Sequence, residues 1–495
     1  MHPGEKSGAT LLDDASVGSI NPKDVDAMVA KGIGMLSIRD RNAIYEEIHG
    51  VSSMAIKETP ELIRDSLRNF EKELENADHA KKFAYDAIMN QEENAVSKDV
   101  ITDDAFRLRF LRFVFFDAKA AVARMISFLD ILHTLYGMEA LKKFDDSMDF
   151  FINTKELKIG LRAGYIQLLP FRDRSGRRII VFVTDCLKLE SKVRIKIFLY
   201  ITYVAGEDVE TQKHGCLMLF WPGVEEIRPP ESSHRSLVSK IINSLPTRFA
   251  CFHFCFPNTP FFNLIRALLS MTMAKQNFRR ITRVKVHCGE RIEMLYELMG
   301  YGIPVALIPT TGTGTLKTKT FAQWIKTKKM MESLKSEGSR ILECPGMKDV
   351  IFRSAGKSCM LHPGNVVFRG IFEKYHDEHV KAGQTGKRDL VWKIVQEIES
   401  KGGRFLGWDK RGWWVVLEER SEIRSKVAIS LRDYNKQQKA IANEQVCKSF
   451  TYVFKQLDSA KRRKQGNMCD CDSSDEGVPH FRESCCFAKM SLLDE

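Results

Sequence analysis

The spacing of apolar and polar positions divides the chain into helical and strand-like stretches. Apolar residues recur every three or four positions over 21–51, 61–91 and 103–137, as in amphipathic helices. From 164 onward, short apolar runs alternate with helical segments. The runs predict strands at 164–171, 178–183, 215–222, 248–256 and 281–289, and the segments between and after them predict helices at 190–204, 232–245, 260–276 and 290–299.

The alternation of strands and helices is typical of an α/β domain with a largely parallel sheet. The stretch "RDRSGR" (172–177) is expected to join the first two strands as a hairpin. The runs "IIVFV" and "CLMLF" are apolar throughout, which indicates strands covered on both faces. A helical N-terminal region precedes this domain, and a small separate α+β module follows it.

The segment boundaries follow from changes in composition along the chain. The segments are 1–20, disordered; 21–99, helical; 100–325, the α/β domain; 326–346, a basic helical linker; 347–434, the α+β module; and 435–495, a tail that is first helical and then disordered.

Charge and cysteine content limit the partners and compartments that we expect for the protein. The 495 residues carry a net charge of +12, which suits an anionic membrane surface or a nucleic acid. No stretch approaches the roughly 18–20 apolar residues of a spanning helix, and the N-terminus lacks the pattern of a secretory signal. Most cysteines lie inside apolar runs, where a thiol acts as a small hydrophobic group. We expect a cytoplasmic protein, with peripheral membrane contact as one option.

The stretch "RFACFHFCFPNTPFFNLIRALL" (248–269) gathers aromatic residues around one polar turn. One interpretation is an ordinary buried strand followed by its helix. The other is the wall of a cavity for an apolar ligand, because the segment 261–273 is apolar on most of its circumference. The basic residues that follow suit anionic headgroups; they are Lys275, Arg279, Arg280, Arg283 and Lys285. They could equally form a solvated face.

Four segments come in the order found in a known family. They are "FLRFVFFDAKAAVARM" (110–125), "PNTPFFNLIRALL" (257–269), "RRITRVKVH" (279–287) and "YGIPVALIP" (301–309). This order resembles the CRAL-TRIO lipid-binding family, over about residues 100–315. Two segments depart from the family pattern, namely "IPTTGTG" (308–314) and the short hairpin at 173–176.

The resemblance implies a hydrophobic slot with a movable helix and a non-enzymatic function in binding, transferring or sensing a lipid. Its ligand would be a lipid or another hydrophobic small molecule. The residues expected to line the slot are Phe252, Phe254, Phe261, Leu264, Leu268 and Met271. Those expected to contact a membrane or headgroup are Lys275, Arg279 and Arg280.

The C-terminal module carries four motifs, "HPGNVVFR" (362–369), "IVQEIESKGGRFL" (394–406), "GWWVV" (412–416) and "KVAISLRDY" (426–434). They resemble an uncharacterised domain family of diatom-like algae. The motif residues are His362, Pro363, Gly364, Asn365, Arg369, Gly402, Gly403, Arg404 and Trp413. The pattern predicts two helices, a hairpin and a closing helix, with Asn365 capping the first helix.

An alternative function places the activity in this module. Trp408, Trp413 and Trp414 lie near basic residues, a combination that can contact nucleic acid or a protein partner. The chain would then be a regulatory protein with a degenerate central scaffold. The tryptophans could equally be core residues. No motif of a P-loop, a nucleophile elbow or a zinc site is found, so we expect no enzyme activity, cofactor or metal. The oligomeric state is not indicated.

Overall fold

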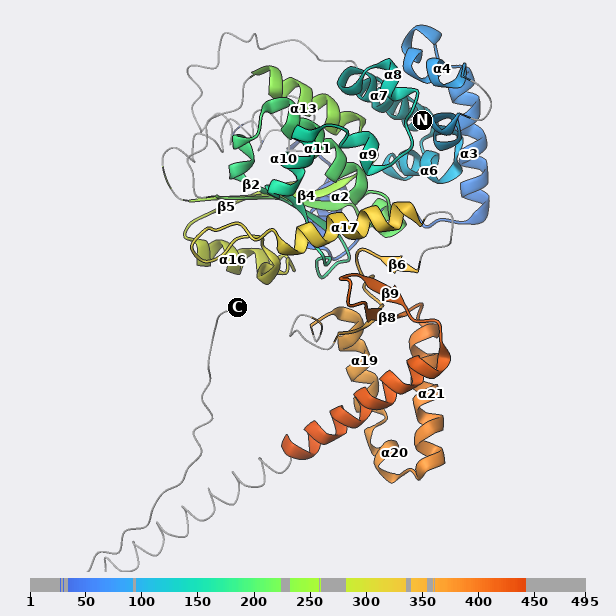
Figure 1. Ribbon diagram of the computed structural model, residues 1–495, viewed down its shortest axis with the longest axis vertical. Helices are drawn as coiled ribbons and strands as arrows, with labels where there is room; N and C mark the ends of the chain where they lie inside the picture. Colours follow the sequence, from blue (N-terminus) through green and yellow to red (C-terminus); the bar gives the residue numbers. More distant parts are fainter. Residues whose placement is uncertain are drawn as a thin grey trace, which may run out of the picture. The chain divides into compact units, whose positions relative to one another are not determined.

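The computed structural model describes residues 34–91, 95–223, 232–257, 282–334, 340–353 and 361–441, with the single residues 27, 30, 259 and 359. The chain forms two compact units, Met1–Val427 and Ala428–Glu495 (Figure 1). The predictions for 1–20, for the helix 260–276 and for the tail beyond 441 lie outside the described residues. None of the helices in the described ranges is long and apolar enough to cross a membrane.

A five-stranded mixed sheet forms the centre of the first unit. Its strands lie side by side in chain order: β1 (Ile166–Leu168), β2 (Arg178–Val183), β3 (Cys216–Trp221), β4 (Phe249–Phe256) and β5 (Val284–Cys288). β1 pairs antiparallel with β2, and the remaining pairs are parallel. The five predicted strands, the hairpin and the largely parallel α/β fold are therefore confirmed.

Helices cover both faces of this sheet. α11 (Ser191–Ala205) and α13 (Ser232–Ser244) connect successive parallel strands and pack in one apolar cluster with α7 (Ala118–Tyr136). α2 (Ile38–His49) and α16 (Arg291–Gly300) contribute to a second cluster on the opposite face. Figure 1 shows α11 and α13 on one side of the strands and α16 on the other. Right-handed crossovers between strands in chain order place their helices on the same face.

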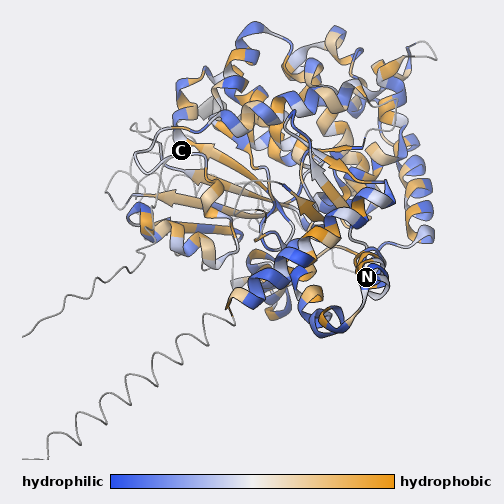
Figure 2. Cartoon of the chain, turned by 60° about the horizontal axis from the view of Figure 1, so that its bottom comes forward, coloured by the Kyte–Doolittle hydropathy of each residue, from blue (hydrophilic) through white to orange (hydrophobic). Residues whose placement is uncertain are grey.

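β2, β3 and β4 are buried on both faces, as their apolar runs predict, whereas β5 at the edge of the sheet is only partly buried (Figure 2). On the side of α11 and α13, neighbouring strands contribute a row of phenylalanine rings. Phe220 stacks on Phe182 with a centroid distance of 5.0 Å and on Phe254 with 4.4 Å. The buried Cys216, Cys251 and Cys255 fill the space between larger side chains as free thiols.

The helices before the sheet begin in the predicted helical region 21–99 and continue to residue 163, within the segment 100–325 that was assigned to the α/β domain. They are α3 (Pro60–Glu75), η2 (His79–Lys81), α4 (Phe83–Met89), α5 (Val96–Thr102), α6 (Asp104–Phe113), α8 (Met138–Leu141), α9 (Met148–Phe151) and α10 (Lys155–Ala163). The short elements η3 (Thr184–Lys188), α12 (Val209–His214) and η4 (Val305–Leu307) lie between strands or after α16. As predicted, α7 ends at Gly137, whose φ of 85° favours glycine.

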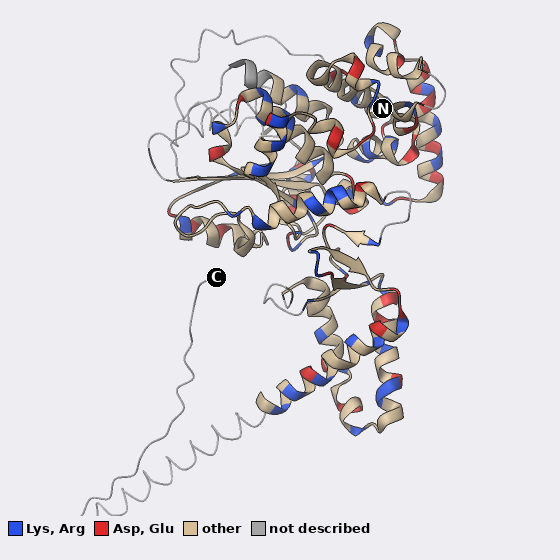
Figure 3. Ribbon diagram, in the orientation of Figure 1, with Lys and Arg blue, Asp and Glu red and all other residues tan. Residues whose placement is uncertain are grey.

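α17 (Lys319–Ser333) follows the α/β domain and is rich in lysine (Figure 3). It begins before the expected linker boundary at 326. Phe321 and Trp324 are buried in the apolar cluster of α7 and α11. Beyond the helix, Glu343 forms an ion pair with the buried Arg178 at the start of β2, and it accepts a hydrogen bond from Nε1 of Trp324 at 3.1 Å. This segment is therefore held to the α/β domain by specific contacts.

The C-terminal module has a four-stranded sheet and three helices before its closing helix. The strands are β6 (Ile341–Leu342), β7 (Val350–Phe352), β8 (Phe405–Trp408) and β9 (Trp414–Val416), in the order β6-β9-β8-β7. The helices are α19 (Pro363–Lys374), α20 (His376–Lys381) and α21 (Gln384–Ser400). The β8–β9 hairpin is present as predicted, but three helices precede it instead of the predicted two, because the first predicted helix is divided into α19 and α20 at Tyr375. The sequence pattern did not predict β6 and β7, whose apolar runs have only two and three residues.

Candidate functional site

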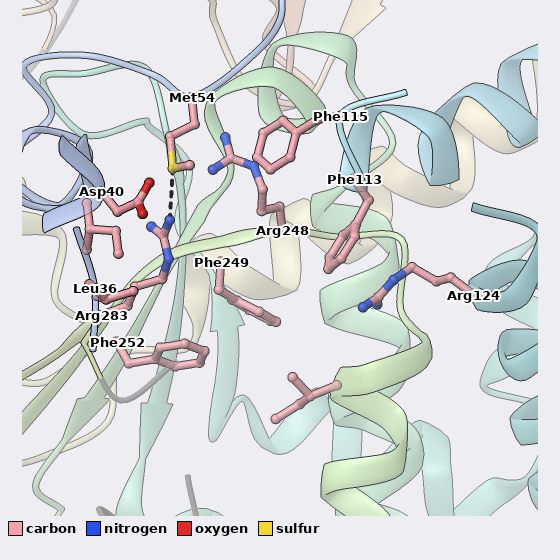
Figure 4. Close-up of a pocket in the computed structure, with 12 residues that line it drawn as sticks. Leu36, Asp40, Met54, Phe113, Phe115, Arg124, Arg248, Phe249, Phe252 and Arg283 are labelled. Carbon is pink, nitrogen blue, oxygen red and sulfur yellow. Dashed lines mark hydrogen bonds between the residues drawn. The ribbon is translucent and has the colours of Figure 1, made fainter. Parts of the chain in front are cut away.

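A pocket of about 210 Å³ lies at the amino-terminal end of β4 (Figure 4). Its wall combines aromatic rings with three guanidinium groups. The lining residues are Leu36, Asp40, Ile44, Met54, Phe113, Phe115, Arg124, Ile242, Arg248, Phe249, Phe252 and Arg283. They come from α2 and its flanks, from α6, α7 and the turn between these two helices, from α13 and β4, and from the residue before β5. The pocket can therefore contact an apolar group and an anionic group at once.

A break in strand pairing directs two phenylalanines of β4 into the pocket. Phe249 pairs with Cys216, but the next residue of β3, Leu217, pairs with Cys251. Ala250 is thus an extra residue, as in a β-bulge. Phe249 and Phe252 consequently lie on the same face of the sheet, and Figure 4 shows both rings projecting into the cavity.

The turn between α6 and α7 supplies another aromatic wall under backbone strain. Phe115 and Phe116 have φ angles of 56° and 66°, in the left-handed region that residues with a large side chain rarely adopt. Such conformations cost about 1–3 kcal/mol each and are found mainly at functional sites. The turn presents Phe113 and Phe115 to the pocket, where Arg124 lies over the ring of Phe113 at 3.5 Å.

A buried carboxylate holds two of the three arginines. Glu47 of α2 is only 1% exposed and forms ion pairs with both Arg248 and Arg283. Burial by itself would raise the pKa of Glu47, but the two guanidinium groups outweigh this effect and hold the pKa below its usual value. Nε of Arg248 is buried and has no hydrogen-bond partner within the described part of the chain. This nitrogen is a donor that a bound anion could satisfy.

The charges of the pocket sum to a positive value. Three guanidinium groups face two carboxylates, those of Glu47 and Asp40, which leaves one net positive charge. Arg124 donates to the carbonyl oxygen of Leu245 at 2.7 Å, so its position is fixed by α13 and the loop that follows. An anionic group is therefore favoured over a cationic one in this cavity.

The predicted slot residues fall into two groups. Phe252 lines the pocket, whereas Phe254 lies one step further along the same face, 2% exposed and stacked on Phe220. Arg283, from the basic cluster, also lines the pocket. The other predicted slot and headgroup residues lie outside the described residues; they are Phe261, Leu264, Leu268, Met271, Lys275, Arg279 and Arg280.

Sequence reasoning missed Arg248, Arg124, Phe115 and Glu47. Arg248 and Phe115 lie within stretches already noted for their aromatic residues, so a basic or aromatic residue at the edge of an apolar run was an available signal. The sequence contains no signal for Glu47, because it is one of several acidic residues on a charged helix. Only the tertiary fold brings it to β4 and β5.

The "HPGN" motif of the C-terminal module holds a strand. The N-cap position of α19 is His362 and the helix begins at Pro363, so the prediction that Asn365 caps this helix was wrong. The amide of Asn365 instead accepts from the backbone N–H of Ile351 at 2.8 Å and donates to its carbonyl oxygen at 2.9 Å. A side chain at Gly364 would overlap the carbonyl oxygen of Asp349. The motif therefore fixes β7 against α19.

Two more motif residues, Arg404 and Gly403, contact the residues directly before the same strand. Arg404 forms a bidentate ion pair with the buried Asp349, with distances of 3.0 and 2.9 Å. Gly403 approaches the backbone of Lys348 too closely for a side chain, and Gly402 has a φ of 76°. Burial lowers the pKa of His362 to about 4, against the opposing effect of Asp349. Arg369 is half-buried on α19.

Two of the three tryptophans of the module are core residues. Trp413 is 5% and Trp414 is 2% exposed. Trp408 is half-buried, and the guanidinium group of Arg353 covers its ring at 4.3 Å. The rings of Trp413 and Trp414 are therefore not presented to solvent as a stacking surface for bases.

Comparison with known proteins identifies only the C-terminal module. A family model described as "Domain of unknown function (DUF6824)" matches residues 349–433. No curated protein matches the chain, and no CRAL-TRIO match covers residues 100–325. The matched range contains the "HPGN" and "GGRFL" motifs.

Proposed function

We propose that the protein binds a hydrophobic ligand with an acidic headgroup, without catalysing a reaction. The pocket at the start of β4 holds the headgroup, and the apolar part of the ligand continues along the aromatic face of the sheet. The CRAL-TRIO resemblance is part of this proposal and supplies the expectation of a lipid. Transfer or sensing at a membrane surface is the expected use of such a complex.

One observation carries the proposal. Two of the segments that motivated the resemblance contribute to one pocket: 110–125 supplies Phe113, Phe115 and Arg124, and 279–287 supplies Arg283. Phe249 and Phe252 come from β4, which directly precedes a third such segment, 257–269. β4 and β5 are neighbouring parallel strands, so their amino-terminal ends meet at one edge of the sheet, where residues of α6, α7 and the turn between them also line the pocket.

The size of the pocket limits what it accommodates. Pockets for drug-sized ligands have volumes of roughly 300–1,000 Å³. The cavity of about 210 Å³ suits a phosphate or carboxylate headgroup with the first carbons of a chain. Phe252 belongs to both the pocket and the apolar cluster of Phe254 and Phe220, so it marks the direction in which a chain would continue.

Lipid extraction from the purified full-length protein tests the proposal. Mass spectrometry should detect an acidic lipid in stoichiometric amount, and incubation with liposomes containing anionic lipid should load protein from which the ligand has been removed. The proposal is wrong if no lipid co-purifies and anionic liposomes load no more lipid than a mock incubation does.

The alternative of nucleic-acid or partner binding through the C-terminal module has less support. Its motif residues hold β7, and Trp413 and Trp414 are buried. A salt-dependent shift of DNA mobility by the full-length chain would favour this alternative, because phosphate contacts give steep salt dependence.

A further inference from the structure

A row of three titratable side chains runs from the sheet to the protein surface on the face opposite the pocket. His253 of β4 is fully buried, and its Nδ1 lies 2.9 Å from Nε2 of His287 on β5. Nδ1 of His287 in turn contacts the carboxylate of Glu297 on α16, whose side chain is 52% exposed. The row links two strands and a helix, and its outer end meets solvent.

The geometry leaves room for only two protons on the two imidazole rings. Nδ1–H of His287 donates to Glu297, and Nδ1–H of His253 donates to Nε2 of His287. Nε2 of His253 is buried and has no hydrogen-bond partner among the described residues. Only one of the two facing nitrogens, Nδ1 of His253 and Nε2 of His287, can carry a hydrogen. A third proton on the pair therefore always leaves an N–H at Nε2 of His253, which has no partner among the described residues. Leaving a buried donor unsatisfied is unfavourable.

The surroundings also oppose a positive charge on the pair. The ring of Tyr301 meets both imidazoles edge-on, at centroid distances of 4.8 and 5.6 Å. The titratable and charged groups around the pair are Glu297 and Tyr301 on the α16 side, His49 of α2, Arg177 before β2, Lys285 of β5, and Cys251 and Cys255 of β4. Glu297 is the one carboxylate among them, against two fixed positive charges.

Burial of the histidine pair makes the stability of this region depend on pH. Burial places the pKa of His253 well below its usual value, and the charge of His287 adds to this effect. Burial also lowers the pKa of His287, although Glu297 acts in the opposite sense. The folded state therefore binds protons less readily than the unfolded state. Stability from this region is complete above about pH 6.5 and decreases as the pH falls toward the lower folded-state values.

We propose that the His253–His287–Glu297 row is a pH-sensitive latch that releases β5 and α16 from the sheet under mildly acidic conditions and thereby opens the ligand pocket. β4 and β5 carry both features: Phe252 and Arg283 contribute to the pocket, and His253 and His287 form the latch on the other face. The opening of the pocket rests on the proposed function, whereas the loosening of β5 and α16 does not.

Hydrogen exchange of the full-length protein tests the latch. Between about pH 7.5 and about pH 5.5, and after correction for intrinsic exchange rates, amides of β5 and α16 should lose about tenfold more protection than those of α3. His253→Phe, which cannot be protonated, should abolish this selective loss. His79→Asn removes a histidine that is 84% exposed and serves as the matched control. Equal pH dependence in wild type and His253→Phe would overturn the latch.

A variant at the surface end of the row tests the latch independently, in case His253→Phe does not fold. Glu297→Gln removes the carboxylate that holds up the folded-state pKa of His287, so this pKa falls further below its value in the open state and the selective loss of protection at about pH 5.5 should become larger. Glu139→Gln, at a carboxylate 86% exposed on α8, should leave it unchanged. An unchanged loss of protection in Glu297→Gln would contradict the assignment of Glu297 to the latch.

The coupling to the pocket has its own measurement. A pyrene-labelled alkyl sulfonate keeps its charge at both pH values, and its dissociation should become about tenfold faster at the lower pH in wild type but not in His253→Phe. A dissociation rate independent of pH would overturn the coupling. If the probe does not bind at all, the proposed function fails, and hydrogen exchange alone decides the latch.

Discussion

Glu47 is the residue on which the architecture of the pocket depends. A single buried carboxylate pairs with both Arg248 and Arg283 and reduces their repulsion across the start of β4 and β5. It also ties α2 to these strands, although α2 lies about two hundred residues away in sequence. The residue therefore links the stability of the fold to the charge of the site.

Glu47→Gln should lower the free energy of unfolding by about 3–5 kcal/mol at neutral pH, because two buried guanidinium groups lose their counter-charge. Since the pKa of Glu47 is lowered by folding, its contribution is present above about pH 4.3 and is lost as the pH falls further. The difference between variant and wild type should thus shrink in acid. Urea titrations at several pH values measure it, and a constant difference would contradict this account.

Phe115 and Phe116 allow strain and binding to be separated. Both have positive φ angles, but only Phe115 lines the pocket. Glycine at either position should relieve strain of about 1–3 kcal/mol, which partly offsets the lost ring contacts. Phe115→Gly should also weaken binding of a pyrene-labelled fatty acid by about tenfold or more, whereas Phe116→Gly should not. Equal losses in fluorescence titrations of both variants would show that Phe115 has no special role.

At the scale of single elements, the C-terminal module depends on the short strand β7. Asn365 satisfies both backbone groups of Ile351, and Arg404 pairs with Asp349 at the start of the strand. The sequence motif is therefore accounted for by these structural contacts. Asn365 and Arg404 of the matched domain thus have a structural role, and these contacts do not assign a function to the domain.

Asn365→Ala should remove both hydrogen bonds to Ile351 and destabilise the module by about 1–3 kcal/mol. The effect should be concentrated in faster hydrogen exchange at β7, whereas Asn153→Ala, at an exposed position before α10, should change little. Unchanged exchange at β7 would mean that the motif does not fix the strand.

Element prediction from the sequence worked where the pattern was strong. All five strands of the central sheet were predicted, most clearly β2, β3 and β4, because strands buried on both faces contain long apolar runs such as 179–183. β6 and β7 were missed, since two or three apolar residues give no periodic signal. The N-cap of α19 was misplaced because Asn365 follows a proline-glycine turn, yet its side chain is used by a distant strand.

At the scale of the whole chain, the candidate site could be predicted only in part. Phe252 and Arg283 were found because aromatic and basic residues cluster in sequence near β4 and β5. Glu47, Phe115 and Arg124 come from elements more than a hundred residues earlier, and only the fold assembles them. The histidine pair was not recognised either, because its meaning lies in the contact between neighbouring strands.

The central claim is that the pocket at the start of β4 binds an acidic amphiphile. The most direct measurement compares a pyrene-labelled fatty acid with its methyl ester in fluorescence titrations of the full-length protein at neutral pH. The acid should bind at least about tenfold more tightly than the ester, and Arg248→Met should remove this preference while Arg64→Met, at an exposed position of α3, should keep it. Equal affinity for acid and ester, or a preference unchanged in Arg248→Met, would contradict the account.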